Sequence, residues 1–220
     1  MGAVRCVVFD LGGVVVRICR TWQEACERAG VPVRDPDRFR DPGAVAGRSH
    51  AVHLHQTGQV SCDEFFALVA ESSAGLYAPE EVRRVHEAWT MHDYAGLADL
   101  IDRLNAPGGP LTACLSNTNH THWNILRQGG THADQLPSPA IARLVRPLVS
   151  HELRASKPGI EIYRMAEQQL GFAGDQIVLF DDLEENVAAA NSLGWQARRI
   201  DPLQETSPQM IAWLRELGIG

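Results

Sequence analysis

The chain has 220 residues, a formal net charge of −7 and 45% hydrophobic residues. This length suits one sizeable domain, or a core with a small accessory domain, and the hydrophobic content predicts a buried core. The net negative charge argues against nucleic acid and anionic membrane surfaces as partners. No run approaches the roughly 20 apolar residues that a membrane-spanning helix requires.

The cysteines predict a cytoplasmic protein with reduced thiols. There are five of them, an odd number, and no two form a CxxC pair. This pattern fits buried thiols better than a disulfide framework or a zinc site. The first apolar run, residues 4–9, is too short for a secretory signal and ends in Asp10.

Short apolar segments alternate with helical patterns along most of the chain. Residues 4–9, 111–116 and 177–180 are predicted to be buried strands, and residues 195–200 a fourth. Helical patterns cover residues 160–170, 184–193 and 208–217. This order predicts an α/β fold with a doubly wound parallel sheet covered by helices on both faces.

The segment from about residue 17 to residue 89 differs from the rest. It contains helical patterns at residues 21–29, 62–72 and 79–89 but no convincing strand. Ser61 and Glu64 have the spacing of a capping box at the start of the second of these helices. We therefore expect a helical insertion after the first strand. Residues 128–147 are loop-like and show no clear periodicity.

Polar side chains follow the ends of three predicted strands. They are Asp10 after the first, Ser116 and Asn117 after the second, and Asp181 and Asp182 after the third. In an open parallel sheet, ligands bind beyond these carboxyl ends. Clustered carboxylates repel one another unless a cation offsets them, and Mg²⁺ prefers such oxygen ligands. Lys157 would add a positive charge.

Four motifs in chain order resemble those of the haloacid dehalogenase (HAD) superfamily. They are "VVFDLGGV", "CLSNTN", Lys157 in "RASKPGIEIY", and "VLFDDLEENVAAANSLGW". The resemblance implies a HAD-like Rossmannoid core made of residues 1–15 and 90–220, with a small helical cap at residues 16–89. "HLHQTGQVSCDEF" and "LSNTNHTHW" also resemble the branch that contains α-D-glucose-1-phosphate phosphatase.

The resemblance also implies a role for each motif residue in a Mg²⁺-dependent phosphatase. Asp10 would attack a small phosphate ester, possibly a sugar phosphate, and form an aspartyl-phosphate. The implied metal ligands are Asp10, the carbonyl of Gly12 and Asp182, and the implied phosphate-binding residues are Ser116, Asn117 and Lys157. Asp181 would support the metal site from outside the ligand shell, and Asn186 would steady its loop.

One position departs from the pattern of the phosphatases in this superfamily. They usually carry a second Asp, a general acid and base, where this chain has Gly12. Losing such a group typically lowers a rate by about 10²- to 10⁴-fold. A substrate with a good leaving group would need less help, or another residue would supply the proton. The histidines near the motifs are candidates for that role: His53, His55, His120 and His122.

Two alternatives to the phosphatase stay open. A dehalogenase-like enzyme would use Asp10 on carbon without a metal and would also lack the second Asp. A non-catalytic member would bind a phosphorylated ligand or a protein partner through the same scaffold. We expect a small phosphorylated metabolite as the partner. The sequence leaves the substrate and the oligomeric state open.

Overall fold

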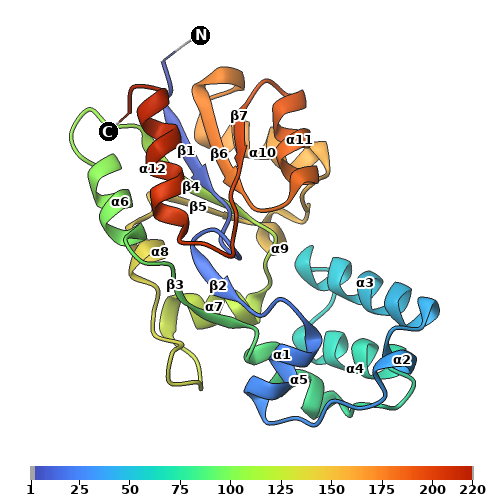
Figure 1. Ribbon diagram of the computed structural model, residues 1–220. Helices are drawn as coiled ribbons and strands as arrows, with labels where there is room; N and C mark the ends of the chain where they lie inside the picture. The colour runs from blue at the N-terminus through green and yellow to red at the C-terminus, as the bar shows by residue number, and fades with distance from the viewer. Residues whose placement is uncertain (1–2, 220) are drawn as a thin grey trace.

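The computed structural model describes residues 3–219 and contains a five-stranded sheet in which all neighbouring strands are parallel (Figure 1). The strand order is β5-β4-β1-β6-β7. Their bounds are β1 Cys6–Phe9, β4 Leu111–Ser116, β5 Arg146–Val149, β6 Ile177–Asp181 and β7 Gln196–Arg199. The predicted α/β class and all four predicted strands are confirmed. The edge strand β5 was not predicted, because two of its four residues are exposed and one of these is Pro147.

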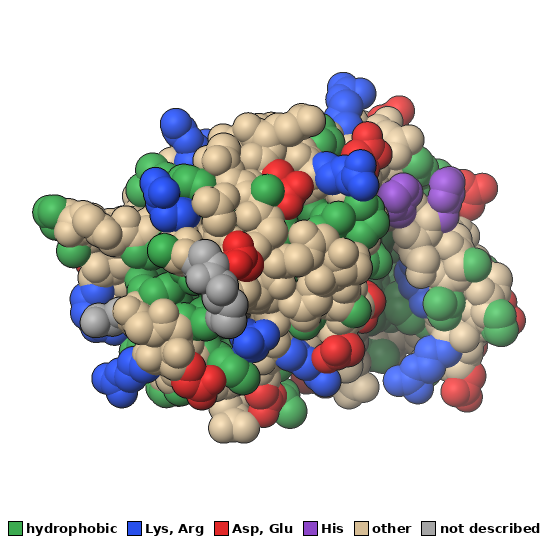
Figure 2. Space-filling view, turned by 90° about the horizontal axis from the view of Figure 1, so that it is seen from above, with side chains coloured by type: hydrophobic (Ala, Val, Ile, Leu, Met, Phe, Trp, Pro, Cys, Tyr) green, Lys and Arg blue, Asp and Glu red, His purple; other side chains and the backbone are tan. Residues whose placement is uncertain are grey.

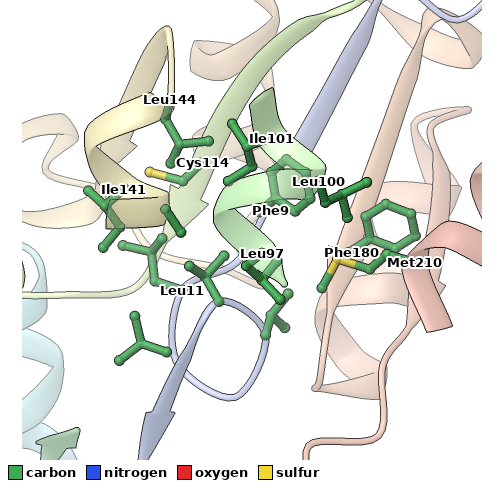
Figure 3. Packing of buried hydrophobic residues seen from close by; sticks show 14 of the residues in the cluster. Phe9, Leu11, Leu97, Leu100, Ile101, Cys114, Ile141, Leu144, Phe180 and Met210 are labelled. Atoms are coloured by element: carbon green, nitrogen blue, oxygen red, sulfur yellow. The ribbon is translucent and has the colours of Figure 1, made fainter. Parts of the chain in front are cut away.

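The two faces of the sheet are covered by different helices. α10 (Ile160–Leu170) and α11 (Glu184–Ser192) cover one face, where Cys6 and Val8 of β1 point. α6 (Leu97–Leu104), α8 (Pro139–Arg143) and α12 (Thr206–Glu216) cover the other. Figure 3 shows this second core, in which Phe9 packs beside Phe180 and Met210. The sheet is thus buried on both sides, which explains the near-continuous apolar runs of its inner strands β1, β4 and β6.

Shorter elements complete the core. α7 (His120–Gln128) follows β4, and α9 (Ser150–Leu153) follows β5. A 3-10 helix, Gly174–Gln176, leads into β6. None of the helices within residues 3–219 is long and apolar enough to cross a membrane. All five cysteines are free thiols.

Five helices lie between β2 (Val16–Ile18) and β3 (Thr90–Asp93), which pair as an antiparallel ribbon. They gather to one side of the sheet, beyond the ends of β1 and β4, and are termed the cap helices (Figure 1). Their bounds are α1 Trp22–Ala29, α2 Pro36–Phe39, α3 Pro42–Gln56, α4 Cys62–Ser72 and α5 Pro79–Glu87. They pack around a hydrophobic cluster of their own.

In the cap segment, the ribbon strands and the helices α2 and α3 were not predicted from the sequence. The ribbon strands were not predicted, because three or four residues carry too little periodicity. α3 was also missed, since only Ala51 and His55 of its fifteen residues are buried and it has no broad apolar stripe. The predicted capping box is confirmed, because Ser61 and Glu64 exchange both of its hydrogen bonds.

Candidate active site

Asp10 lies at the carboxyl end of the central strand β1, where a tight turn begins. Its backbone N–H donates to the carbonyl of Phe180, 2.8 Å away, which ties the turn to β6. Gly13 has φ +80°, and a Cβ there would lie only 2.6 Å from Oδ2 of Asp182. Only glycine fits such a position. The tight turn therefore depends on Gly13.

Gly12 has a different role in this turn. A Cβ on Gly12 would lie 3.2 Å from Cδ1 of Ile18, so the end of a flexible side chain stands where a residue at this position would extend. Gly12 also lines the cavity described below. That the backbone carbonyl of Gly12 binds the metal stays a prediction.

A buried lysine links two of the carboxylates. Nζ of Lys157 lies 2.6 Å from Oδ2 of Asp181, to which it donates, and 2.9 Å from Oδ1 of Asp10. The contact with Asp10 is an ion pair, but Oδ1 of Asp10 has no hydrogen-bond partner with suitable angles. That oxygen lies against the lysine ammonium, which balances part of the negative charge of Asp10.

The electrostatics at this strand end favour protonation of Asp10. Burial raises the pKa of Asp10 to about 6, although Lys157 opposes the shift, and the neighbouring Asp181 adds to it. Burial also raises the pKa of Asp182. Burial alone would lower the pKa of Lys157, but the charges of Asp10 and Asp181 outweigh it and raise that pKa overall. Lys157 is therefore a permanent cation.

Asn117 fixes the backbone that carries this lysine. Its Oδ1 accepts from the backbone N–H of Lys157 at 2.9 Å, and its Nδ2 donates to the carbonyl of Lys157 at 2.8 Å. The side chain thus joins the end of β4 to the loop before α10. Ser116, the last residue of β4, is buried and lines the same cavity as Asn117. A phosphate-binding role for Ser116 and Asn117 stays a prediction.

Asp181 is held by hydrogen bonds on both carboxylate oxygens. Oδ1 accepts from Nδ2 of Asn186 and from the backbone N–H of Leu183, each at 2.9 Å, while Oδ2 faces Lys157. Asn186 in turn accepts from the hydroxyl of Tyr163 at its carbonyl. These contacts suit a residue that positions Lys157, while the predicted support of the metal site by Asp181 and Asn186 stays a prediction.

The donor set fits a hard divalent cation. Asp10, Asp181 and Asp182 each offer a carboxylate oxygen within 4.8 Å of the others, and all three are buried. Hydrogen bonds occupy both oxygens of Asp181, so Asp10 and Asp182 are the carboxylates with more capacity for a cation. Carboxylate oxygens are ligands that Mg²⁺ prefers. The residues therefore fit Mg²⁺ at this strand end.

Arg20 is a member of the site that sequence reasoning missed. It follows β2, and its Nη1 lies 3.0 Å from Oδ2 of Asp182. Three carboxylates thus face two cations, Lys157 and Arg20, in the folded chain. No motif singles out Arg20, since it reaches Asp182 across 162 positions of sequence.

A cavity of about 450 Å³ opens between the sheet end and the cap helices. Figure 2 shows a hollow between the larger body and the smaller lobe, with hydrophobic side chains at its edge. The core contributes Gly12, Ser116 and Asn117 to its lining, whereas the cap contributes mainly apolar side chains. Those apolar cap residues are Trp22, Phe39, Val52, Phe65, Val69, Val82 and Trp89. A ligand here would touch both parts.

The four histidines considered as proton donors divide into two pairs. His53 and His120 are exposed and do not line the cavity, whereas His55 and His122 do. Nε2 of His122 lies 2.8 Å from the carbonyl of His86, and Nδ1 lies 3.2 Å from Nδ2 of Asn119. Both nitrogens of His122 are therefore engaged.

Of the three histidines that line the cavity, the two that the sequence singled out, His55 and His122, are neutral at pH 7. Burial lowers the pKa of His55 to about 4 and that of His122 to about 4. A neutral imidazole is a poor proton donor to a leaving group. His55 keeps an unpartnered Nε2, so among these four histidines only His55 has a buried ring nitrogen free for a ligand.

Solved structures with the same fold include both metal-bound and dehalogenase examples. A HAD family enzyme from Bacteroides thetaiotaomicron, in complex with magnesium and inorganic phosphate, is 18% identical, with a TM-score of 0.69 over 94% of this chain and 99% of that chain. A predicted HAD-like family hydrolase from Porphyromonas gingivalis is 22% identical, with a TM-score of 0.70 over 97% and 99%.

A third solved structure with this fold is a dehalogenase. L-2-haloacid dehalogenase from Xanthobacter autotrophicus, with chloropropionic acid covalently bound, is 16% identical, with a TM-score of 0.60 over 96% of this chain and 83% of that chain. At these identities the three structures establish the fold alone. The model of the haloacid dehalogenase-like hydrolase family matches residues 4–194. The chain therefore belongs to the haloacid dehalogenase-like hydrolases.

Proposed function

We propose that this hydrolase is a Mg²⁺-dependent phosphatase that cleaves a small phosphorylated metabolite through an aspartyl-phosphate. The observation that carries the proposal is the buried Asp10, whose Oδ1 lies 2.9 Å from the buried ammonium of Lys157 and whose carboxylate lies close to two further carboxylates. A nucleophile that attacks an anion needs such nearby positive charge.

Each residue has a defined part in this reaction. Asp10 attacks phosphorus with Oδ1, the P–O bond to the leaving group breaks, and the alcohol leaves as its anion or takes a proton from water. Ser116 and the ammonium of Lys157 hold the phosphoryl oxygens, and they bind most strongly when charge builds on them. Asn117 and Asp181 keep Lys157 in place. Water then cleaves the acyl phosphate and restores Asp10.

Mg²⁺, when bound by Asp10, Asp182 and the carbonyl of Gly12, would screen the negative charge of the phosphate from the attacking carboxylate. The test is phosphate release from p-nitrophenyl phosphate with Mg²⁺ and with EDTA, together with mass-spectrometric detection of a phosphorylated Asp10 after a rapid acid quench. Hydrolysis that EDTA stops and that passes through this adduct supports the proposal. Absence of turnover across a broad panel of phosphate esters contradicts it.

The missing acid at Gly12 predicts a steep dependence on the leaving group. For a series of substituted phenyl phosphates, kcat/KM should fall sharply as the pKa of the released phenol rises. Gly12→Asp restores a carboxyl group and should raise the rate on alkyl phosphates by roughly tenfold or more, with little change on p-nitrophenyl phosphate. Ile18, the nearest side chain, has a flexible end that can yield to the new group.

Gly12→Asn is the matched control for this experiment. It adds a side chain of the same shape that has no proton to transfer, so it should not help alkyl phosphates. Equal gains in the Asp and Asn variants would show that the effect comes from packing. A flat dependence on the leaving group in the original chain would show that another residue already supplies the proton.

We expect Arg20 to compete with Mg²⁺ for the carboxylate of Asp182. Its guanidinium is paired with Asp182, a proposed ligand, so Arg20→Gln should tighten Mg²⁺ binding by roughly 3- to 10-fold at fixed ionic strength. Isothermal titration calorimetry with Mg²⁺ alone measures this. Arg17→Gln is the control, because Arg17 pairs with Glu205 instead. Equal effects of the two variants would assign the change to net charge.

The same ion pair favours a second candidate function. Arg20 supplies an internal cation to Asp182, the kind of compensation that a metal-independent enzyme needs. In that case Asp10 would displace halide from carbon, as in the dehalogenase alternative. Halide release from 2-haloacids that EDTA does not affect would support this candidate and contradict the phosphatase.

A further inference from the structure

Arg48 is the only Lys, Arg, Asp or Glu among the side chains that line the cavity in the described part of the chain. Its guanidinium carbon stacks 3.6 Å from the centroid of the Phe39 ring, and Nη2 donates to the carbonyl of Phe39 at 2.6 Å. Nη1 is buried without a hydrogen-bond partner. No carboxylate within residues 3–219 forms a salt bridge with Arg48.

Two more unpartnered nitrogens belong to the same wall. Nε1 of Trp22, which can only donate, is buried without a partner, and its ring stacks on the Phe39 ring at 4.9 Å. Nε2 of His55 is also unpartnered, and only 3% of this residue is exposed. Arg48, Val52 and His55 are spaced so that they share one face of α3. A buried donor without a partner is costly, so the Arg48 guanidinium and the Trp22 indole N–H indicate an absent acceptor, and Nε2 of His55 can donate as well when it carries the ring proton.

Several polar groups elsewhere in the lining already have partners within the protein. Asn117 bonds to the backbone of Lys157, and Asn119 and His122 bond to each other. Most of the remaining cap wall is hydrocarbon, with Gln56 and His86 as its other polar side chains. This wall suits an apolar ligand body better than a ring of hydroxyl groups, since each hydroxyl would need its own partner.

We infer that the cap side of the cavity is a carboxylate-binding subsite formed by Arg48, Trp22 and His55. The inference rests on the proposed function and narrows its substrate to a phosphate monoester with an apolar body that carries a carboxylate. One guanidinium with the indole N–H of Trp22, joined by His55 in the tautomer that protonates Nε2, matches a planar monoanion. A second phosphate dianion would keep an uncompensated charge in apolar surroundings.

The test compares 4-carboxyphenyl phosphate with 4-carbamoylphenyl phosphate, which has nearly the same shape without the charge. The unaltered enzyme should prefer the carboxylate by about 10- to 100-fold in kcat/KM. Arg48→Gln should remove this preference, mainly through KM, while the rate on phenyl phosphate changes little. Arg48→Lys keeps the positive charge but loses the planar guanidinium that can donate two parallel hydrogen bonds, so it should retain part of the preference. Arg40→Gln removes an exposed cap guanidinium outside the cavity and should have no effect.

Three results would overturn the inference: equal kcat/KM for the two esters, equal losses on both in Arg48→Gln, or a preference for 1,4-phenylene bisphosphate over the carboxylate. Hydrolysis of none of the esters would instead contradict the proposed phosphatase. Calorimetric binding of the same two esters to Asp10→Asn would then still decide the subsite. Tighter binding of the carboxylated ester that Arg48→Gln abolishes supports it, and equal binding overturns it.

Discussion

Asp10→Asn should abolish turnover and at the same time stabilise the folded protein. Without its nucleophile the enzyme should lose at least about 10⁴-fold in kcat. Stability should rise because burial and Asp181 make the ionised Asp10 unfavourable, so its pKa is raised to about 6. The stability conferred by protonated Asp10 is fully present below the unfolded-state pKa near 3.8 and is lost as the pH rises through about 6.

The amide side chain that replaces Asp10 in the variant stays neutral at every pH, so the variant avoids this loss. Above pH 7 the expected gain is at most about 3 kcal/mol, or roughly 5–10 °C in Tm for a chain of this size. Thermal unfolding in EDTA between pH 4 and pH 8 measures the difference in Tm between the variant and the unaltered protein. This Tm difference should increase up to about pH 7 and then stay constant. Mg²⁺ should narrow it by stabilising the unaltered protein. A Tm difference that does not change with pH would contradict the raised pKa of Asp10.

Lys157→Met should have the opposite effect on stability. The methionine keeps an unbranched apolar stem but removes the buried cation that faces Asp10 and Asp181. Breaking such a buried pair typically costs about 3–5 kcal/mol, because the remaining charge is left uncompensated. Turnover should fall by roughly 10²- to 10³-fold, since the phosphoryl oxygens lose a donor.

A double-mutant cycle that combines Lys157→Met with Asp10→Asn tests whether Lys157 stabilises the protein through Asp10 or through Asp181 alone. If Asp10 and Lys157 are coupled, Asp10→Asn should stabilise the Lys157→Met protein more than it stabilises the unaltered protein. Chemical denaturation in EDTA at pH 8 provides the four unfolding free energies. Additive effects would show that Lys157 acts on stability through Asp181 alone, and an unchanged Tm in Lys157→Met would contradict the charge balance between this lysine and its two carboxylates.

The sequence was informative where local pattern and position coincide. Buried parallel strands have continuous apolar runs, so β1, β4 and β6 could be found, and each ends at or just before a polar residue of the site. The edge strand β5 and the helix α3 could not be found this way, because each buries only a few residues and neither shows a clear period. Whether these segments form a strand or a helix depends on the other parts of the chain that they contact.

The sequence by itself determined the α/β class, the family resemblance and the strand-end residues from Asp10 to Asp182, because these features depend on short segments. Only the tertiary structure decided that Asn117 holds the backbone of Lys157 and that Arg20 pairs with Asp182. The same is true of Arg48, whose unpartnered nitrogen belongs to an otherwise neutral cavity wall. The physical reason is that hydrogen bonds and desolvation act between groups that are close in space, and these groups are far apart in sequence.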